Sequence, residues 1–562
     1  MGLSLVHPKY MTYILIVRRI YRYNKIRLYI SISLLKAMLE PVQFLSFFIF
    51  FLLPWLLLPL TNKIFSHKKL SPSQSSSHLP KSYPIIGCYL AFRKHMKHPV
   101  NWLSEVLQKS PTSTFVLDLP LVEQQVHMAN PENIKHILKT QFALYPKGSI
   151  FTSTLHDLLG QGIINVDGDL WNFQRQIASH EFTTNSLNKF IEMVVDAELS
   201  GRLIPILSDA AKNRTVLDIQ DILTRFTFDN ICQIAFGYDP EGLSPSLPES
   251  QFTSAFDEAG AIITERFKTI FPMLWKIKRF LNIGTEKKLR KAVHVVREFA
   301  RTVVRQKKKE LEGQNHGSLL ESNLDLLSRF LRSGHIDEEF VTDIVISFIL
   351  AGRDTTSATL TWFFWLLSRN PSAEDEIMAE ISAKNSSDCV SDKNLALKEM
   401  KHMVYTHAAL CETMRLYPPV PVDSKEPISD DVLPDGTKVK KGTRVVFHPY
   451  AMGRSEKLWG NDWPEFRPER WLERGPAGEE VRKWSFVPRD PYTYPVFQAG
   501  PRICLGREMA FLQMKRVVAG VLSQFRLVPA VEDSFEPVFI PAMSALMKGG
   551  LPVRIEERKM IV

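Results

Sequence analysis

The residues most able to do chemistry in this 562-residue chain lie in one stretch, from Phe497 to Gly506, which reads Phe-Gln-Ala-Gly-Pro-Arg-Ile-Cys-Leu-Gly. Its cysteine, Cys504, stands between Gly500 and Gly506, and Arg502 precedes it by two residues. A thiolate is a soft ligand, and a lone cysteine in such a loop suits a haem iron held from one side. The glycines allow a tight turn and a close approach to a flat macrocycle. A buried structural cysteine in a Gly-Pro turn is the alternative.

The element that must position Cys504 is a helix that the sequence predicts from Glu508 to Leu522. Cys504 then lies near the N-terminus of this helix, where free N–H groups and the positive end of the dipole stabilise a thiolate. The position therefore favours a metal-binding thiolate over an inert thiol.

A second element must face the cysteine from the other side. The sequence predicts a largely apolar helix over 337–370, about 50 Å long, with Gly352, Asp354 and Thr355 in its middle. Gly352 would let a flat partner approach, and Thr355 can bond back to the carbonyl of Ala351. An acid–alcohol pair beside dioxygen can relay protons. The alternative is a core helix whose threonines satisfy themselves and whose Asp354 pairs with a nearby base.

Together these segments resemble the cytochromes P450, the haem-thiolate monooxygenases. The loop matches Phe-x-x-Gly-x-Arg-x-Cys-x-Gly at every fixed position, and Ala351 to Thr356 match the family's oxygen-binding motif Ala-Gly-x-Asp-Thr-Thr. The resemblance runs from about Pro80 to the end of the chain. It implies a mainly α fold with small β-sheets and haem b with an axial thiolate from Cys504. It also makes Asp354 and Thr355 the catalytic pair.

Haem propionates need cationic partners, and arginine suits carboxylates through its bidentate fork. Arg502 is the first candidate by its position. By resemblance the other cofactor-binding residues are Trp171, Arg175, Lys425, Phe497 and Gly506. The alternative for Trp171 and Arg175 is ordinary packing of the ring with a snorkelled arginine charge.

Three further charged residues resemble a structural network of the family. Glu412 and Arg415 lie one helical turn apart among apolar neighbours, which favours a buried pair, and Arg470 is the third member by resemblance. An exposed pair of this kind would contribute only about 0.2–0.5 kcal/mol. We assign the three residues to folding and haem retention.

The substrate side is predicted to be a long apolar cavity. A closer resemblance is to plant enzymes that oxidise the terminal methyl of fatty acids or of jasmonoyl-isoleucine, carried by residues 170–182, 351–367 and 547–553. The predicted pocket residues are Phe151, Leu155, Phe348, Ile349, Ala351, Val420, Val422 and Met543. Each of these alone is more often a core residue.

The N-terminal region is predicted to be an appendage of four parts. Residues 1–37 are a non-native or variable extension, 38–62 a transmembrane anchor, 63–84 a polar tether with a Pro-rich hinge, and 85–562 the monooxygenase domain. A cleaved signal peptide is the competing interpretation of the apolar run. The net charge is +10, and residues 1–37 carry +7 of it, so residues 38–562 carry only +3. A nucleic-acid partner is therefore not expected.

Five unpaired cysteines and lysines after the apolar run place the domain in the cytosol, on the endoplasmic reticulum membrane. The expected partners are NADPH-cytochrome P450 reductase, the membrane and a lipophilic small molecule. The expected reaction is hydroxylation of a fatty acid at or near its terminal carbon, with jasmonoyl-isoleucine as the alternative substrate. Rearrangement of fatty hydroperoxides, a haem-based gas sensor and a structural membrane protein are the rival functions.

The other helices and strands are predicted from the hydrophobic periodicity of the sequence and from its Gly and Pro residues. Further helices are predicted over 187–203, 216–237, 285–312 and 409–416, and strands over 114–119, 125–129, 443–448 and 551–555.

Overall fold

A computed structural model describes residues 80–83, 87–119, 124–182, 185–269, 272–313, 325–332, 337–385, 403–475, 484–532, 534–541 and 543–558. Helices dominate these residues, and the strands form small sheets, as predicted. The predicted extension, the anchor and most of the tether lie outside the described residues. Among the residues that are described, we find no helix that is both long and apolar enough to cross a membrane.

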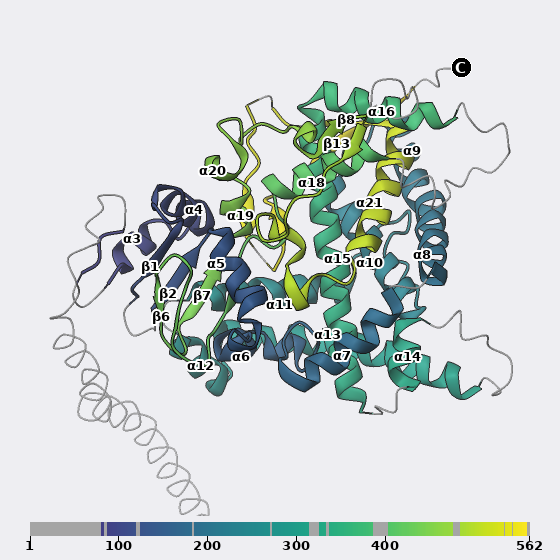
Figure 1. Cartoon of the computed structure of the whole chain (residues 1–562). Helices are drawn as coiled ribbons and strands as arrows, with labels where there is room; N and C mark the ends of the chain where they lie inside the picture. Colours follow the sequence, from purple (N-terminus) through teal and green to yellow (C-terminus); the bar gives the residue numbers. More distant parts are fainter. Residues whose placement is uncertain are drawn as a thin grey trace, which may run out of the picture. The chain divides into compact units, whose positions relative to one another are not determined.

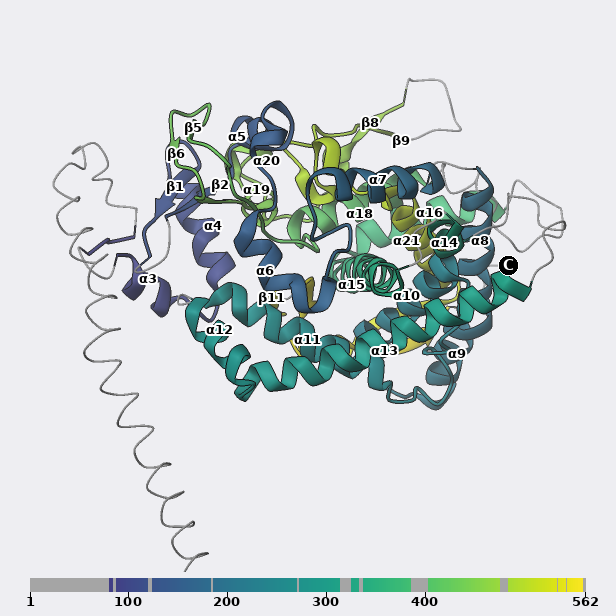
Figure 2. The same ribbon diagram turned by 90° about the horizontal axis from the view of Figure 1, so that it is seen from below.

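The long helix α15 (Glu338–Ser368) is buried along most of its length. It begins where the sequence predicts, because the Asp337 side chain accepts a hydrogen bond from the Glu339 N–H. Figure 2 looks along α15, with α10 (Ile219–Phe236), α13 (Gly284–Gly313) and α18 (Val404–Leu416) around it. The predicted helices over these segments are thus confirmed within a few residues.

One predicted helix end is wrong. The segment expected to stop before Pro205 is α8 (Asn185–Glu198), which continues through a π-helical turn (Leu199–Leu203) directly into α9 (Ile204–Asn213). Pro205 is the second residue of α9, which follows the π-helical turn directly.

The other helices cover the sides of α15 or carry the loops of the site. They are α3 (Tyr89–Lys94), α4 (Pro99–Lys109), α5 (Pro131–Lys135), α6 (Gly148–Leu159), α7 (Gly168–Phe182), α11 (Gln251–Lys268), α12 (Pro272–Leu281), α14 (Leu326–Arg332), α16 (Pro371–Asn385), α19 (Pro449–Met452), α20 (Glu456–Trp459) and α21 (Arg507–Leu522).

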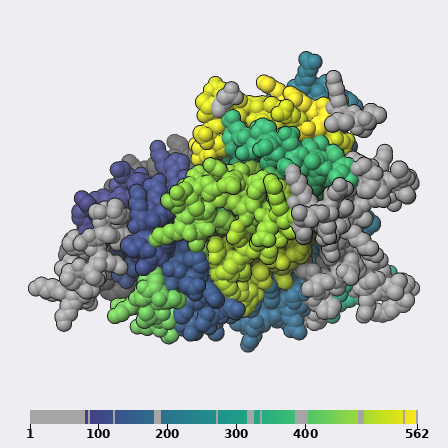
Figure 3. Space-filling view, turned by 45° about the horizontal axis from the view of Figure 1, so that its top comes forward, coloured from purple at the N-terminus to yellow at the C-terminus, as the bar shows by residue number. Residues whose placement is uncertain are grey.

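The largest sheet has four strands in the order β1-β2-β7-β4. Its strands β1 (Thr114–Leu117), β2 (Gln125–Met128), β7 (Arg444–Phe447) and β4 (Asp423–Lys425) include three of the four predicted ones. Strands β2 and β7 run parallel, and the other neighbours are antiparallel. Figure 1 shows this sheet beside α4 and α6, and on the face in Figure 3 N-terminal residues (purple and blue) adjoin green residues that follow α18.

The remaining strands form small sheets. A three-stranded sheet has the order β10-β13-β3, with β10 (Phe525–Pro529), β13 (Pro552–Glu557) and β3 (Leu217–Asp218). The two-stranded sheets are β11 (Phe539–Pro541) with β12 (Ala545–Met547), β5 (Asp431–Val432) with β6 (Lys438–Val439), and β8 (Leu472–Arg474) with β9 (Trp484–Phe486).

Two buried histidines link β2 to the end of β7. His127 Nδ1 and His448 Nε2 lie 2.8 Å apart, and neither residue is more than 4 % exposed. Burial lowers the pKa of His448 to about 3 and that of His127 well below its usual range. Both imidazoles are therefore neutral in the folded protein at pH values where the unfolded chain already binds protons.

This pair makes stability depend on pH. As pH falls from about 6.5 toward 3, the unfolded state binds more protons, so the free energy of unfolding should fall by up to about 1.4 kcal/mol per pH unit for each imidazole. We expect the loss between pH 7 and pH 5 to be smaller in His448→Gln than in the wild type, measured by urea unfolding. An identical loss in both proteins would contradict the role of the pair.

Candidate active site

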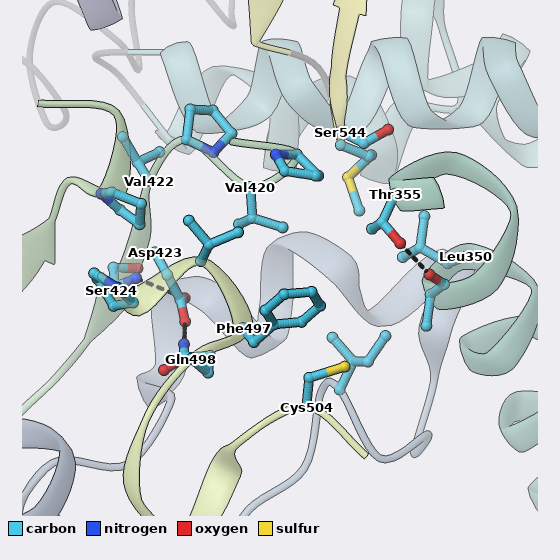
Figure 4. Close-up of a pocket in the computed structure, with 18 of the residues that line it drawn as sticks. Leu350, Thr355, Val420, Val422, Asp423, Ser424, Phe497, Gln498, Cys504 and Ser544 are labelled. Carbon is cyan, nitrogen blue, oxygen red and sulfur yellow. Dashed lines mark hydrogen bonds between the residues drawn. The ribbon is translucent and has the colours of Figure 1, made fainter. Parts of the chain in front are cut away.

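A cavity of about 550 Å³ lies between α15, the Cys504 loop and one face of the four-stranded sheet. In Figure 4 Cys504 lies at the lower side of this pocket, with Thr355, Val420 and Ser544 above it. Side chains alternate between the two faces of the sheet. His127 and Val446 line the cavity, while Val126 and Val445 pack in a second core on the other face. The fold therefore brings the two chemically active segments to one space.

Backbone geometry holds Cys504 at this cavity. Gly500 has a φ of +65°, and a Cβ there would meet the Leu138 carbonyl oxygen at 2.0 Å, so only glycine fits. The Cys504 N–H donates to the Phe497 carbonyl at 2.8 Å, and α21 begins at Arg507, as predicted within one residue.

The environment of Cys504 acts on its thiol in two directions. The cysteine is exposed, and the space to which it is exposed is the cavity. Burial behind the protein surface raises the pKa of the Cys504 thiol, while the Gly506 N–H and the positive Arg175 and Arg507 lower it. The loop thus offers a sulfur aimed at a metal, with donors and positive charge that stabilise its anionic form.

The predicted cofactor-binding cations gather beside this loop. Arg502 donates to the Val166 carbonyl at 2.7 Å and to Asp167 at 2.6 Å, and its guanidinium lies 4.5 Å from the centre of the Trp171 ring. Arg175 also lines the cavity; burial lowers its pKa, and the nearby Cys504 thiolate raises it. The predicted Trp–Arg pair is therefore at the site.

Lys425 is a buried basic residue, only 1 % exposed, whose side-chain nitrogen has no hydrogen-bond partner among the described residues. Burial first, and then the positive Lys147, lower the pKa of Lys425 well below its usual range. Lys425 is not among the residues that line the cavity, but it lies near Arg502. A buried side-chain nitrogen without a partner favours a ligand that brings an acceptor, as a haem propionate does. The donor set and the thiol together fit haem.

The middle of α15 is only partly arranged as predicted. Thr355 lines the cavity and its Oγ1 donates to the Ala351 carbonyl at 2.7 Å. Asp354 does not line the cavity: it accepts from Arg353 at 2.8 Å, and the same Arg353 nitrogen lies 2.8 Å from Asp257 of α11. Burial raises the pKa of Asp354. The structure therefore brings Thr355, but not Asp354, to the cavity wall.

Gly352 lies where α15 meets both the cavity and helix α10. A Cβ at this position would meet the Ile231 side chain of α10 at 2.5 Å. The glycine thus allows α10 to pack closely against α15. Gly352 also lines the cavity, and the approach of a flat ligand to it stays a prediction.

Seven of the eight predicted pocket residues line the cavity, namely Phe151, Leu155, Phe348, Ala351, Val420, Val422 and Met543. Ile349 does not; it is fully buried in the core around α15. Residues that sequence reasoning missed include Phe267 at the end of α11 and Arg444 on β7. The alternation of strand 443–448 was a usable signal for Arg444, because it places Arg444 and Val446 on one face.

The predicted structural charges form one buried network. Glu412 and Arg415 are both 0 % exposed, and the Arg415 Nε and Nη2 each donate to the Glu412 carboxylate at 2.8 Å. Arg470 Nε donates to the same carboxylate at 3.2 Å, and Trp471 Nε1 at 3.0 Å. The network joins α18 to the segment before β8, away from the cavity wall.

A cysteine thiol aimed into an apolar cavity, a group of buried cations beside it and a long helix opposite define a haem-thiolate enzyme. Residues 78–553 match the Cytochrome P450 family, and the chain belongs to that family. It is 56% identical over 508 residues to Cytochrome P450 94A2 of Vicia sativa, covering 90% of this chain and 97% of that protein.

Two other relatives extend the comparison. Cytochrome P450 94A1 of Vicia sativa is 58% identical over 481 residues, covering 85% of this chain and 91% of the relative. Cytochrome P450 94B1 of Arabidopsis thaliana is 46% identical over 495 residues, covering 88% of this chain and 94% of the relative. The protein is a cytochrome P450 monooxygenase, and its cofactor is haem b with the Cys504 thiolate as axial ligand.

Proposed function

We propose that this protein hydroxylates the terminal or near-terminal carbon of a fatty acid. The observation that carries the proposal is the apolar cavity that has Cys504 on one side and Thr355 on the other. A cavity of about 550 Å³ with mainly apolar walls accepts an alkyl chain and excludes water from it. The resemblance to plant enzymes that oxidise fatty-acid terminal methyls supports the same substrate class.

Each site residue has a proposed role. Haem held by a thiolate activates dioxygen for insertion of one oxygen atom. Cys504 holds the iron, Arg175, Arg502 and Lys425 hold the propionates, and Trp171 packs against Arg502. Phe497, whose carbonyl accepts from the Cys504 N–H, and Gly506 shape the loop around the sulfur.

Thr355 is the proposed proton carrier at the cavity wall. Its hydroxyl hydrogen-bonds to the Ala351 carbonyl and can turn to a water in the cavity. Asp354 acts behind it: through Arg353 it ties α15 to Asp257 of α11. With its pKa raised, Asp354 is suited to exchange a proton with water that reaches α15.

Thr355→Ala should lower product formation by about 100-fold, at the low end of what a positioned proton donor contributes. NADPH consumption should fall less, because oxygen reduction continues without productive proton delivery. The measurement is product formed per NADPH oxidised. Thr355→Ser keeps the hydroxyl and is the matched control; equal losses in both variants would contradict the role of the hydroxyl.

The protein is proposed to act at the endoplasmic reticulum membrane, facing the cytosol, with residues 38–62 as the anchor, 63–84 as the tether and 85–562 as the catalytic domain. Helix α12 supports contact of this domain with lipid. Its apolar Met273, Leu274, Ile277 and Phe280 are 50–88 % exposed, and Lys276, Lys278 and Arg279 lie among them. A lipophilic substrate would reach the cavity from the bilayer.

The decisive experiment supplies the full-length protein with NADPH, NADPH-cytochrome P450 reductase and a panel of fatty acids and jasmonoyl-isoleucine. Hydroxylation of a fatty acid at or next to its terminal methyl is the expected result. Oxidation of jasmonoyl-isoleucine alone would favour the second candidate, which the same resemblance supports. Conversion of fatty hydroperoxides without NADPH would contradict the proposal.

A further inference from the structure

Arg444 is a cation in the wall of a mainly apolar cavity. It lies on β7 opposite Gln125 of β2, on the face that turns toward the cavity with Val446. The residue is half-buried, and its Nε is buried and without a hydrogen-bond partner among the residues that the structure describes. A buried N–H of a charged group is costly when it is left unpaired, so the position favours a ligand that brings an acceptor.

The groups around Arg444 do not neutralise it. Asp423 acts on it through space, without a hydrogen bond, while the Asp423 carboxylate accepts from Lys147 Nζ at 3.4 Å and from the side chain of Gln498. His127 and His448 face it as neutral imidazoles, since burial and the charge of Arg444 both lower their pKa values.

Burial lowers the pKa of Arg444 itself only to about 10. The guanidinium therefore keeps its charge at neutral pH.

Arg444 contacts a different aromatic ring from the one that Arg502 contacts. Its guanidinium is 5.4 Å from the centre of the Phe267 ring, and Phe267 lies 5.9 Å from Phe151 of α6. The charge on β7 thus lies beside aromatic rings of α6 and α11.

We propose that Arg444 binds the carboxylate of the substrate and so determines which carbon is oxidised. A carboxylate held at β7 directs the alkyl chain across the apolar walls toward Cys504, with the far end of the chain at the reacting side. The inference rests on the proposed function and adds its specificity residue. Arginine suits this role because its planar fork binds a carboxylate with two parallel hydrogen bonds.

The test compares Arg444→Gln with Arg444→Lys in the full-length holoenzyme. Calorimetry measures binding of dodecanoate, its methyl ester and jasmonoyl-isoleucine. Arg444→Gln should weaken dodecanoate binding roughly 10- to 100-fold, the worth of a hydrogen bond to a charged group, and leave the ester nearly unchanged. Arg444→Lys should recover part of the affinity. Oxidation by Arg444→Gln should spread from the terminal carbon to positions within the chain.

Three results would overturn this inference. Equal weakening of acid and ester would assign Arg444 to packing, and unchanged dodecanoate binding would leave it without a role in recognition. Loss of haem per protein in Arg444→Gln, with Arg444→Lys retaining it, would make Arg444 a propionate partner instead. If the wild type oxidises no fatty acid and no jasmonoyl-isoleucine, the proposed function itself fails, whatever the Arg444 variants bind.

Discussion

Replacing Cys504 with alanine is expected to abolish monooxygenase activity and the red-shifted band that carbon monoxide produces with reduced thiolate-ligated haem. The substitution removes the sulfur that the Gly500 turn and the start of α21 aim into the cavity. Because Cys504 is exposed to the cavity and not packed in a core, the loss of one sulfur atom should cost the fold little. The effect should therefore fall on the cofactor and not on secondary structure.

Cys411→Ala is the matched control for this prediction. Cys411 lies on α18 and is 3 % exposed, and burial raises the pKa of its thiol far above the usual range. A buried neutral thiol of this kind packs like a small apolar side chain and does not ligate metal. The control should keep the carbon monoxide band. A Cys504→Ala protein with normal turnover would refute the assignment of the ligand.

The second large effect is expected at Glu412. Its carboxylate accepts hydrogen bonds from Arg415, Arg470, Trp471 and the N–H of Arg467, and it is 0 % exposed. Glu412→Gln keeps the size of the side chain but leaves the Arg415 guanidinium buried without its counter-charge. Removing one partner of a buried ion pair costs about 3–5 kcal/mol of folding free energy.

This loss is a large share of a typical domain's stability, so we expect a sharply lower urea midpoint and a low yield of haem-loaded protein. Glu265→Gln supplies the comparison, because Glu265 forms an i,i+3 pair with Lys268 but is 67 % exposed. That variant should lose less than about 1 kcal/mol. Similar losses of unfolding free energy in the two variants would show that burial does not increase the contribution of the Glu412 network to stability.

The sequence predicted the parts of the site that depend on local rules. A cysteine between fixed glycines before a helix is a local pattern, and the structure places Cys504 and the start of α21 accordingly. The start of α15 was also predicted correctly, because an aspartate that can cap a helix precedes a long apolar run. The pairing of Glu412 with Arg415 also follows from helical spacing among apolar neighbours.

The parts that depend on tertiary partners were not predictable in this way. Asp354 pairs with Arg353, which also pairs with Asp257 on a separate helix, and the sequence does not show that partner. Gly352 has its bare face against Ile231, a contact set by helix packing. Strand alternation places Arg444 and Val446 on one face of β7, but the pairing of β2 with β7, two strands far apart in the chain, could not be read from the sequence.

The most direct test of the account traces the oxygen atom. The full-length protein is incubated with NADPH, NADPH-cytochrome P450 reductase, dodecanoic acid and ¹⁸O₂ in ordinary water, and the product is analysed by mass spectrometry. The account predicts a hydroxylated acid that carries one ¹⁸O atom at or next to the terminal carbon and that forms only with NADPH. A product without ¹⁸O, or the same product without NADPH, would contradict it.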